Sequence, residues 1–263
     1  MREFNNTLLQ GPAIIRIDEE DIPFVLCTSD LHLNHKNILF YTQRKGIPGI
    51  KDIETMHEVI INNMNDAISQ IPMKYRNKAM MINCGDFIFA SGQNSYDIYK
   101  NFRKKIIPIR WYNVSGNHDS NNLYRTVNFV PDMNNGVELY ESDVMTMKVP
   151  AWYWNSMYIM EIYRGAQCIC VLTISHYPQD DFLGSVNIHG HLHTYEDMSL
   201  FKGTDKEWAE RLRADGHYMD VGIDRNFAKP VWLSDILEGK LDVKLDKVPQ
   251  IKSLKWRYNN FRK

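Results

Sequence analysis

The sequence has no long apolar run, and this absence excludes one class of protein. No stretch of the 263 residues approaches the roughly 18 apolar residues that a membrane-spanning helix requires. Residues 1–10 are polar and contain no apolar core of the kind that marks a secretory signal peptide. We therefore expect a soluble, cytoplasmic protein without a membrane partner.

An excess of charge of one sign is also missing. The formal net charge of -1 argues against a surface that binds nucleic acid over its whole extent, although it does not exclude local patches. Apolar residues make up 44% and charged residues 24%, which is ordinary globular composition. A chain of this length can bury one sizeable core. No internal repeat or low-complexity segment interrupts it.

Cysteine is scarce, with only four residues in the chain. All four lie in apolar runs typical of strands: Cys27, Cys84, Cys168 and Cys170. Cys168 and Cys170 are two residues apart and would share one face of a strand. We favour buried, reduced thiols over a disulfide pair or a zinc knuckle, and hence a reducing compartment.

Apolar runs alternate with helical patterns in the first half of the chain. Strands are expected at 23–29, 79–84 and 109–114, and helices at 53–68 and 95–105. This order predicts a sheet with parallel strands covered by helices. Later, short alternating runs suggest antiparallel strands at 137–140, 143–149 and 157–163. Further strands are expected at 167–174, 186–189 and 217–223, with a charged helix at 204–216 that opens on a capping box, Thr204-x-x-Glu207.

Polar motifs follow five of the strand-like runs. They are Asp30-Leu31-His32, Gly85-Asp86, Gly116-Asn117-His118-Asp119, Ser175-His176 and Gly190-His191-Leu192-His193. In parallel sheets, ligands bind beyond the carboxyl ends of the strands. Carboxylate, imidazole and amide ligands without thiolate suit Mn, Fe, Zn, Co or Ni ions, of which we favour Mn. Two such ions share a bridging carboxylate in hydrolytic centres, and Asp86 is the natural candidate.

The five motifs, in this order, resemble those of the calcineurin-like metallophosphoesterase superfamily, and the resemblance extends from about residue 22 to residue 238. It implies an α/β fold in which a two-sheet β-sandwich is flanked by helices in four layers, α/β/β/α. The second half of the chain would then supply the second sheet. We expect an N-terminal extension at 1–21, the metallophosphoesterase domain at 22–239 and a basic tail at 240–263.

Within that superfamily the chain is most similar to small metallophosphoesterases of bacteria and phages. Three motifs carry this similarity: Asp30-Leu31-His32-Leu33-Asn34-His35-Lys36-Asn37, Ser175-His176-Tyr177-Pro178 and Val221-Gly222-Ile223-Asp224. Serine/threonine phosphatases of the superfamily carry Gly-Asp-x-x-Asp-Arg-Gly, and purple acid phosphatases place a tyrosine ligand where the second Asp stands. This chain has Phe89 there, which cannot bind a metal. Both subfamilies are therefore disfavoured.

The resemblance also implies a set of metal ligands. One ion would be bound by Asp30, His32, Asp86 and His193, and a second by Asp86, Asn117, His176 and His191. A hydroxide bridging the two ions would attack phosphorus in line, and His118 would protonate the leaving oxygen. Asp119 would either orient His118 or stabilise its own loop.

We expect a phosphodiesterase that acts on a nucleotide or nucleic acid, because no arginine lies within the five motifs to bind the dianion of a monoester. The alternatives are a phosphomonoesterase and a catalytically silent interaction module on the same fold. His35 and Asn37 would contact a substrate phosphate or stabilise their loop. The aromatic run Trp152-Tyr153-Trp154 would form a base-stacking wall or a dimer contact. The tail at 240–263, with eight Lys and Arg against two Asp, is either solvated or a docking arm for phosphate-rich partners.

Overall fold

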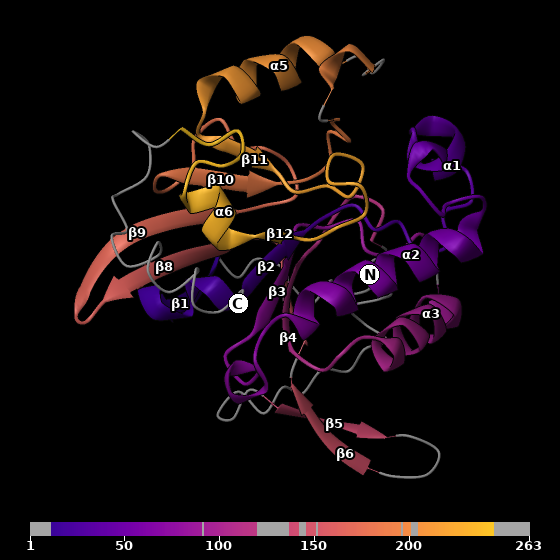
Figure 1. Cartoon of the computed structure of the whole chain (residues 1–263), viewed down its shortest axis with the longest axis horizontal. Helices are drawn as coiled ribbons and strands as arrows, with labels where there is room; N and C mark the ends of the chain where they lie inside the picture. Colours follow the sequence, from indigo (N-terminus) through magenta and orange to yellow (C-terminus); the bar gives the residue numbers. More distant parts are fainter. Residues whose placement is uncertain are drawn as a thin grey trace, which may run out of the picture.

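Two five-stranded sheets pack face to face and carry helices on their outer faces (Figure 1). The computed structural model describes residues 12–90, 92–119, 137–141, 146–150, 152–195, 197–200 and 205–244. One buried cluster joins the facing sides of the sheets, with Cys27 and Ile82 from one sheet and Met160 and Leu172 from the other. This layering confirms the expected α/β sandwich.

The first sheet has the strand order β12-β2-β3-β4-β7. Its strands are β2 (Val25–Thr28), β3 (Met80–Asn83), β4 (Arg110–Val114), β7 (Trp152–Asn155) and β12 (Val231–Trp232). All neighbours are parallel except β12 and β2, as the alternation of strands and helices predicted. The helices α2 (Ile53–Ser69) and α3 (Gly92–Lys105) bury this sheet's outer face (Figure 1).

The second sheet has the order β1-β8-β9-β10-β11. Its strands are β1 (Ala13–Asp18), β8 (Tyr158–Arg164), β9 (Gln167–Ile174), β10 (Val186–His189) and β11 (Tyr218–Asp220). Only β8 and β9 pair in the antiparallel sense. The antiparallel hairpin β5 (Val137–Glu141) and β6 (Thr146–Pro150) forms a separate two-stranded sheet, so these runs do not extend the second sheet.

Short helices fill the connections. They are η1 (Glu19–Phe24), α1 (Ile38–Tyr41), η2 (Arg44–Gly46), η3 (Met73–Tyr75), η4 (Met198–Leu200), α5 (Lys206–Asp215) and α6 (Leu233–Leu237). The helix α5 packs Ala209 and Leu212 near β11. It begins at Lys206, and Thr204 of the expected capping box lies outside the described residues. None of the described helices is both long and apolar enough to span a membrane.

Two segments beyond the expected domain limits of 22 and 239 pack on the sheets. The strand β1 pairs with β8 over its whole length, although only Ile15 and Ile17 of its six residues are buried. At the other end, Val243 is buried in the core between the sheets. The Asp242 carboxylate forms salt bridges of 3.0 Å with Arg213 and 2.6 Å with Arg225. These contacts hold the chain to residue 244 against the body.

The aromatic run in β7 is divided between the two faces of its strand. The ring of Trp154 lies 5.8 Å from Phe87, within the core under the helices. The ring of Tyr153 stacks on Tyr112 at 5.0 Å on the other face. The side chain of Trp152 lies outside the described residues. Two of the three rings are thus used in packing, as the alternation of side chains along a strand requires.

The cysteines follow the expectation of buried, reduced thiols with one exception, which concerns burial. Cys27, Cys84 and Cys170 are free and buried, whereas Cys168 is free and exposed. Cys168 lies next to the turn between β8 and β9, near the register shift at Ile162/Tyr163. The strand projects there beyond the core between the sheets, so its second residue faces solvent.

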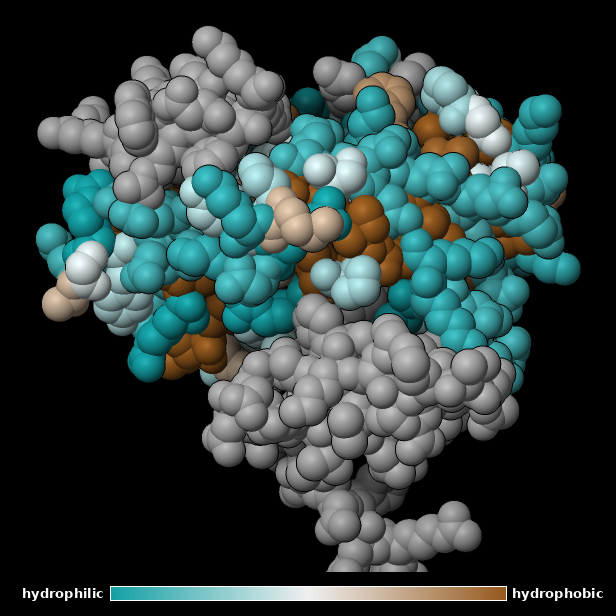
Figure 2. All heavy atoms as spheres, turned by 60° about the horizontal axis from the view of Figure 1, so that its bottom comes forward, coloured by the Kyte–Doolittle hydropathy of each residue, from teal (hydrophilic) through white to brown (hydrophobic). Residues whose placement is uncertain are grey.

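The surface is mostly hydrophilic, with hydrophobic residues gathered near the middle of the face shown in Figure 2. Among the described residues, the large hydrophobic side chains that stay exposed are Ile14, Phe40, Tyr41, Met73, Phe89, Tyr177, Leu183 and Phe227. Single exposed apolar side chains are normal in soluble proteins, whereas a group of them marks a contact surface.

The helix α2 depends on its apolar stripe for its attachment to the first sheet. A capping box starts the helix, because the Asp52 carboxylate accepts from the Thr55 amide at 2.8 Å and Thr55 Oγ1 accepts from the Asp52 amide at 3.0 Å. The apolar stripe that the sequence predicted, with residues every three or four positions, is buried: Ile53, Met56, Ile60, Met64 and Ile68, joined by Ile61 and Ala67.

Replacing Ile60, which is completely buried, should destabilise the protein through the cavity that it leaves. We expect Ile60→Ala to lower the free energy of unfolding by about 2–5 kcal/mol in urea titrations. The matched change Glu58→Ala, on the exposed side of the same helix, should leave it unchanged. Equal values for the two variants would show that α2 does not anchor the core.

Candidate metal centre

The polar motifs converge where the strands end. Three groups of side chains place their candidate ligand atoms within 4.8 Å of one another: Asp30/His32/His193, His32/Asp86/His118 and Asp86/His176/His191. Side chains from the first sheet lie in the segments after β2, β3 and β4. Those from the second sheet lie in the segments after β9 and β10. The centre therefore lies across the carboxyl ends of both sheets, as the motif positions predicted.

Asp86 lies between two of these groups. Its Oδ2 atom is 3.5 Å from the Nε2 atom of His32 and 3.5 Å from the Nε2 atom of His176. Its Oδ1 atom accepts a hydrogen bond of 2.8 Å from the amide of His118. Burial alone would raise the pKa of Asp86, but the hydrogen bond from His176 and the charges of His176 and His32 hold it well below its usual range. The carboxylate is therefore ionised and faces both sides of the centre.

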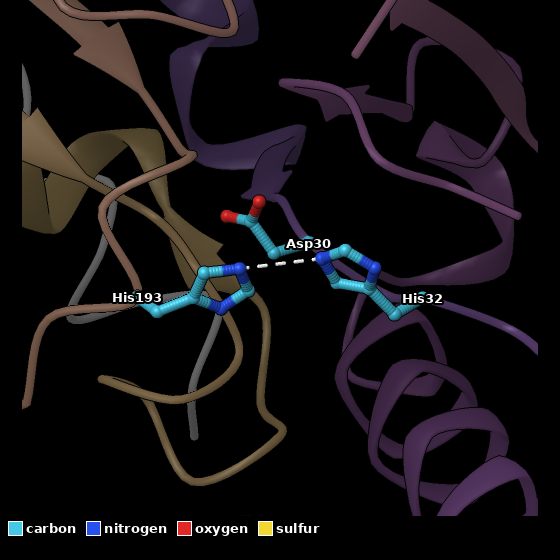
Figure 3. A group of neighbouring side chains, drawn as sticks. All are labelled: Asp30, His32 and His193. Atoms are coloured by element: carbon cyan, nitrogen blue, oxygen red, sulfur yellow. Dashed lines mark hydrogen bonds between the residues drawn. The ribbon is translucent and has the colours of Figure 1, made fainter. Parts of the chain in front are cut away.

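One side of the centre is formed by His32, Asp30 and His193. The two imidazoles face each other with their Nε2 atoms 3.3 Å apart, His32 from the chain after β2 and His193 from the chain after β10 (Figure 3). Burial lowers the pKa of His32, so its ring is neutral. Burial raises the pKa of Asp30 to about 6 despite the opposing charges of His193 and His176. A buried carboxylate beside two convergent imidazole nitrogens is a donor set suited to a divalent cation.

The other side is formed by His176, Asn117 and His191. The Nδ1 atom of His176 donates to the carbonyl oxygen of Cys84 at 2.9 Å, and its Nε2 atom lies 2.9 Å from Asn117 Oδ1. Burial lowers the pKa of His176, but Asp86 and Asp30 raise it to about 9 overall. Burial and the charge of His176 lower the pKa of His191 to about 4. His191 is thus neutral at physiological pH, whereas metal binding would displace a proton from His176.

The backbone of the centre is unusual. Five candidate ligands adopt positive φ: Asp30 (58°), His32 (47°), Asp86 (51°), His191 (71°) and His193 (48°). Such conformations are rare for residues other than glycine and cluster at functional sites. The loops after β2 and β3 hold one another in place, since the amides of Asp30 and His32 donate to the carbonyls of Gly85 and Asp86 at 2.9 Å each.

Glycine at position 116 is required by the approach of Asp86. A Cβ atom there would lie 2.0 Å from Asp86 Oδ1 and 2.2 Å from the Asp86 amide nitrogen. No side chain fits at such distances without moving the carboxylate. The glycine of the third motif therefore sets the position of a candidate ligand from the second.

Comparison with known proteins agrees with this geometry. The model of the family described as calcineurin-like phosphoesterase matches residues 25–245, which is most of the chain. The chain belongs to this family. A solved structure, a protein of unknown function from Aquifex aeolicus, is 18% identical, with a TM-score of 0.48 over 79% of this chain and 94% of that one. The comparison with curated proteins gave no match.

Membership of the calcineurin-like phosphoesterases makes this chain a metal-dependent phosphoesterase, and its His/Asp groups fit divalent metal binding. The donors are carboxylate oxygens and imidazole nitrogens, with no thiolate among the described groups. The free Cys84 is buried in the core between the sheets, and its carbonyl oxygen contacts the centre through His176.

Sequence reasoning missed the residues that orient His193. Its Nδ1 atom lies 2.7 Å from Asp224 Oδ2. Arg44 in turn donates to both Asp224 oxygens at 2.9 and 2.7 Å and to the carbonyl oxygen of Asp30 at 2.7 Å. The side chains of Arg44 and Asp224 are fully buried. Asp224 closes the Val221–Asp224 motif, but nothing in the sequence pairs it with Arg44, which lies 180 residues away.

Asp119 has contacts that support the second of its two predicted roles. Its Oδ1 atom accepts from the amides of Phe87 and Ile88 at 2.8 and 3.0 Å, and its Oδ2 atom accepts from the Gly116 amide at 2.9 Å. Burial raises the pKa of Asp119 to about 6 against these hydrogen bonds. Among the described residues no hydrogen bond joins it to the ring of His118. Two of these hydrogen bonds join the loop after β4 to the loop after β3, and the third lies within the loop after β4.

His35 and Asn37, the expected substrate contacts, occupy different environments. The His35 ring is largely buried, with its Nδ1 atom 3.2 Å from Nδ1 of His32. Asn37 is exposed and precedes α1, where its carbonyl oxygen accepts from the amides of Phe40 and Tyr41. His35 therefore belongs to the surroundings of the centre, whereas Asn37 is the N-cap residue of α1.

Asp224→Asn should weaken metal binding, because it removes the carboxylate that fixes the ring of His193. We expect the affinity of the metal-stripped protein for Mn²⁺ to fall by roughly 10–100-fold in calorimetric titrations. Asp66→Asn, an exposed change on α2, is the matched control. Near-UV circular dichroism would verify the fold of each variant, and an unchanged affinity in folded Asp224→Asn would contradict the role.

Proposed function

We propose that this phosphoesterase binds two divalent ions and cleaves a phosphodiester bond of a nucleotide or nucleic acid. The position of Asp86 carries the proposal, since one carboxylate oxygen lies 3.5 Å from an imidazole nitrogen of each side of the centre. The residues that would hold one ion are Asp30, His32, Asp86 and His193, and those for the other are Asp86, Asn117, His176 and His191. Bound ions would supply Lewis acidity and a nucleophilic water.

One side chain, His118, would transfer the proton to the leaving group. His118 is half-buried at the rim, with its ring 5.1 Å from that of His32. We assign it the role of general acid, which protonates the leaving oxygen. Its amide, bound to Asp86 Oδ1, ties its position to that of the shared carboxylate.

Among the residues that the structure describes, no free guanidinium lies in the hydrogen-bond network around the centre, which supports a diester substrate. Arg44 lies closest to the candidate ligands in this hydrogen-bond network, but it is fully buried. Its donors point to Asp224, to the carbonyls of Asp30 and Leu31, and to the sulfur of Met56. It is therefore not available to bind the second negative charge of a phosphomonoester.

The first test compares hydrolysis of bis-(p-nitrophenyl) phosphate and p-nitrophenyl phosphate with added Mn²⁺. We expect turnover of the diester by the unaltered protein. Asp86→Ala should lose both turnover and metal. His118→Ala should keep its metal and lose roughly 10²–10⁴-fold in kcat on diesters with poor leaving groups. Asp66→Ala serves as the control.

Other outcomes of this test would change the assignment. Turnover of the monoester alone would indicate a phosphatase, and absence of turnover on both esters would favour the interaction module. Near-normal kcat of His118→Ala on a poor leaving group would remove its role as the acid.

Deleting residues 245–263 should spare turnover of small diesters, because the contacts of Asp242 and Val243 lie before the cut. We expect kcat/KM on bis-(p-nitrophenyl) phosphate to stay within about twofold of the full chain, with an unchanged melting temperature. A loss of this activity at an unchanged melting temperature would place the basic tail in the site.

A further inference from the structure

An exposed aromatic ring lies beside the centre without a role in it. Phe89 is 42% exposed. One face of its ring stacks on His35 with centroids 4.0 Å apart and planes at 19°. Its ring also lies 5.3 Å from that of His118, at 63°. The stack on His35 uses one face of the phenyl ring, so the exposed area leaves room for a second planar group.

The position of this ring is fixed by the backbone. The amide of Phe89 donates to the carbonyl oxygen of Leu33 at 2.9 Å, and Leu33 and Ile88 form a β-bridge. The same pairing continues toward the centre, where the Leu33 amide donates to Phe87 at 3.0 Å. Phe89 is therefore mounted on the loops that carry Asp86 and His32. A ring held in this way loses little conformational entropy when a ligand stacks on it.

Aromatic side chains extend this surface to both sides. Tyr41, 73% exposed, lies with its ring 6.2 Å from His35. On the other side of the centre, Tyr177 is 43% exposed, its ring lies 4.1 Å from His191, and its hydroxyl donates to Asn117 Oδ1 at 3.1 Å. Exposed rings thus border the two proposed ion positions.

We propose that Phe89 stacks one nucleobase adjacent to the scissile phosphate. The inference rests on the proposed diesterase function and names its substrate class, a nucleotide diester or single strand with an unpaired base. Aromatic stacking tolerates any base because each has a π-face, and the base must be free of its own stack to reach the ring. His118, the proposed acid, is a neighbour of Phe89. The stacked base would therefore belong to one of the two nucleosides joined by the scissile phosphate, on either the leaving or the retained ester oxygen.

Three compounds test this assignment: thymidylyl-thymidine and its two analogues in which an abasic tetrahydrofuran unit replaces one or the other nucleoside. Phe89→Ala should lower kcat/KM on thymidylyl-thymidine by about 5–150-fold. On the analogue that lacks the stacked base, the unaltered protein and Phe89→Ala should have equal kcat/KM. On the analogue that keeps this base, Phe89→Ala should show the same loss as on thymidylyl-thymidine. Phe89→Trp should retain activity, and Met73→Ala, an exposed change in η3, should match the unaltered protein.

Metal content and the simple diester separate the two proposals. Phe89→Ala should bind Mn²⁺ and hydrolyse methyl p-nitrophenyl phosphate with a metal content and a kcat/KM close to those of the unaltered protein. If the unaltered protein hydrolyses no diester, the proposed function fails. If it hydrolyses diesters but not thymidylyl-thymidine, or if Phe89→Ala affects all three compounds equally, only the stacking role is overturned.

Discussion

The buried ion pair between Arg44 and Asp224 is the interaction on which the centre most depends. Arg44 joins the loop after β2, through the carbonyls of Asp30 and Leu31, to the loop after β11, through Asp224. It thereby fixes the two halves of the chain against each other at the metal centre. Removing one partner would leave a buried charge unpaired, at a cost of about 3–5 kcal/mol. The pair survives in the interior because nearly every donor of the guanidinium has an acceptor, so its desolvation is compensated by hydrogen bonds and charge.

The same arrangement explains how so much backbone strain is maintained in one place. Each left-handed residue costs about 1–3 kcal/mol and persists only where its surroundings over-determine it. Here the hydrogen bonds between the loops after β2 and β3 supply that constraint, and parallel pairing of the two strands brings the loops together in register. The left-handed backbone turns the side chains of Asp30 and His32, which are two residues apart, toward one point. In an extended strand such residues would share one face of the sheet, but their side chains would stay as far apart as the strand rise sets them.

The sequence predicted the centre better than it predicted the sheets around it. Strand-end motifs are local, and parallel strands bring their carboxyl ends to the same edge of one sheet. The resemblance to the metallophosphoesterases, rather than strand order, predicted that motifs from both sheets form one set of ligands. The strand β1 was missed because exposed Ile14 breaks the alternation of Ile15 and Ile17. The strand β7 was not assigned to the first sheet, because it pairs with β4 across a long stretch of sequence and no local pattern marks that pairing. Arg44 has no local signature, since its partner lies 180 residues away and a buried arginine resembles a surface one until the fold is known.

The two sides of the centre differ in ways that bear on catalysis. His193 is oriented by a carboxylate that is itself held by Arg44, whereas His176 is oriented by a neutral carbonyl. A carboxylate partner raises the basicity of an imidazole ligand more than a carbonyl does. Asp30 and His32 are also almost completely buried, while Asn117 is exposed. In the proposed two-ion centre, the ion beside His193 would therefore be held more tightly than the ion beside Asn117. The position beside Asn117 would be the more exposed of the two, and the carboxylate of Asp86 would couple the occupancy of one position to that of the other.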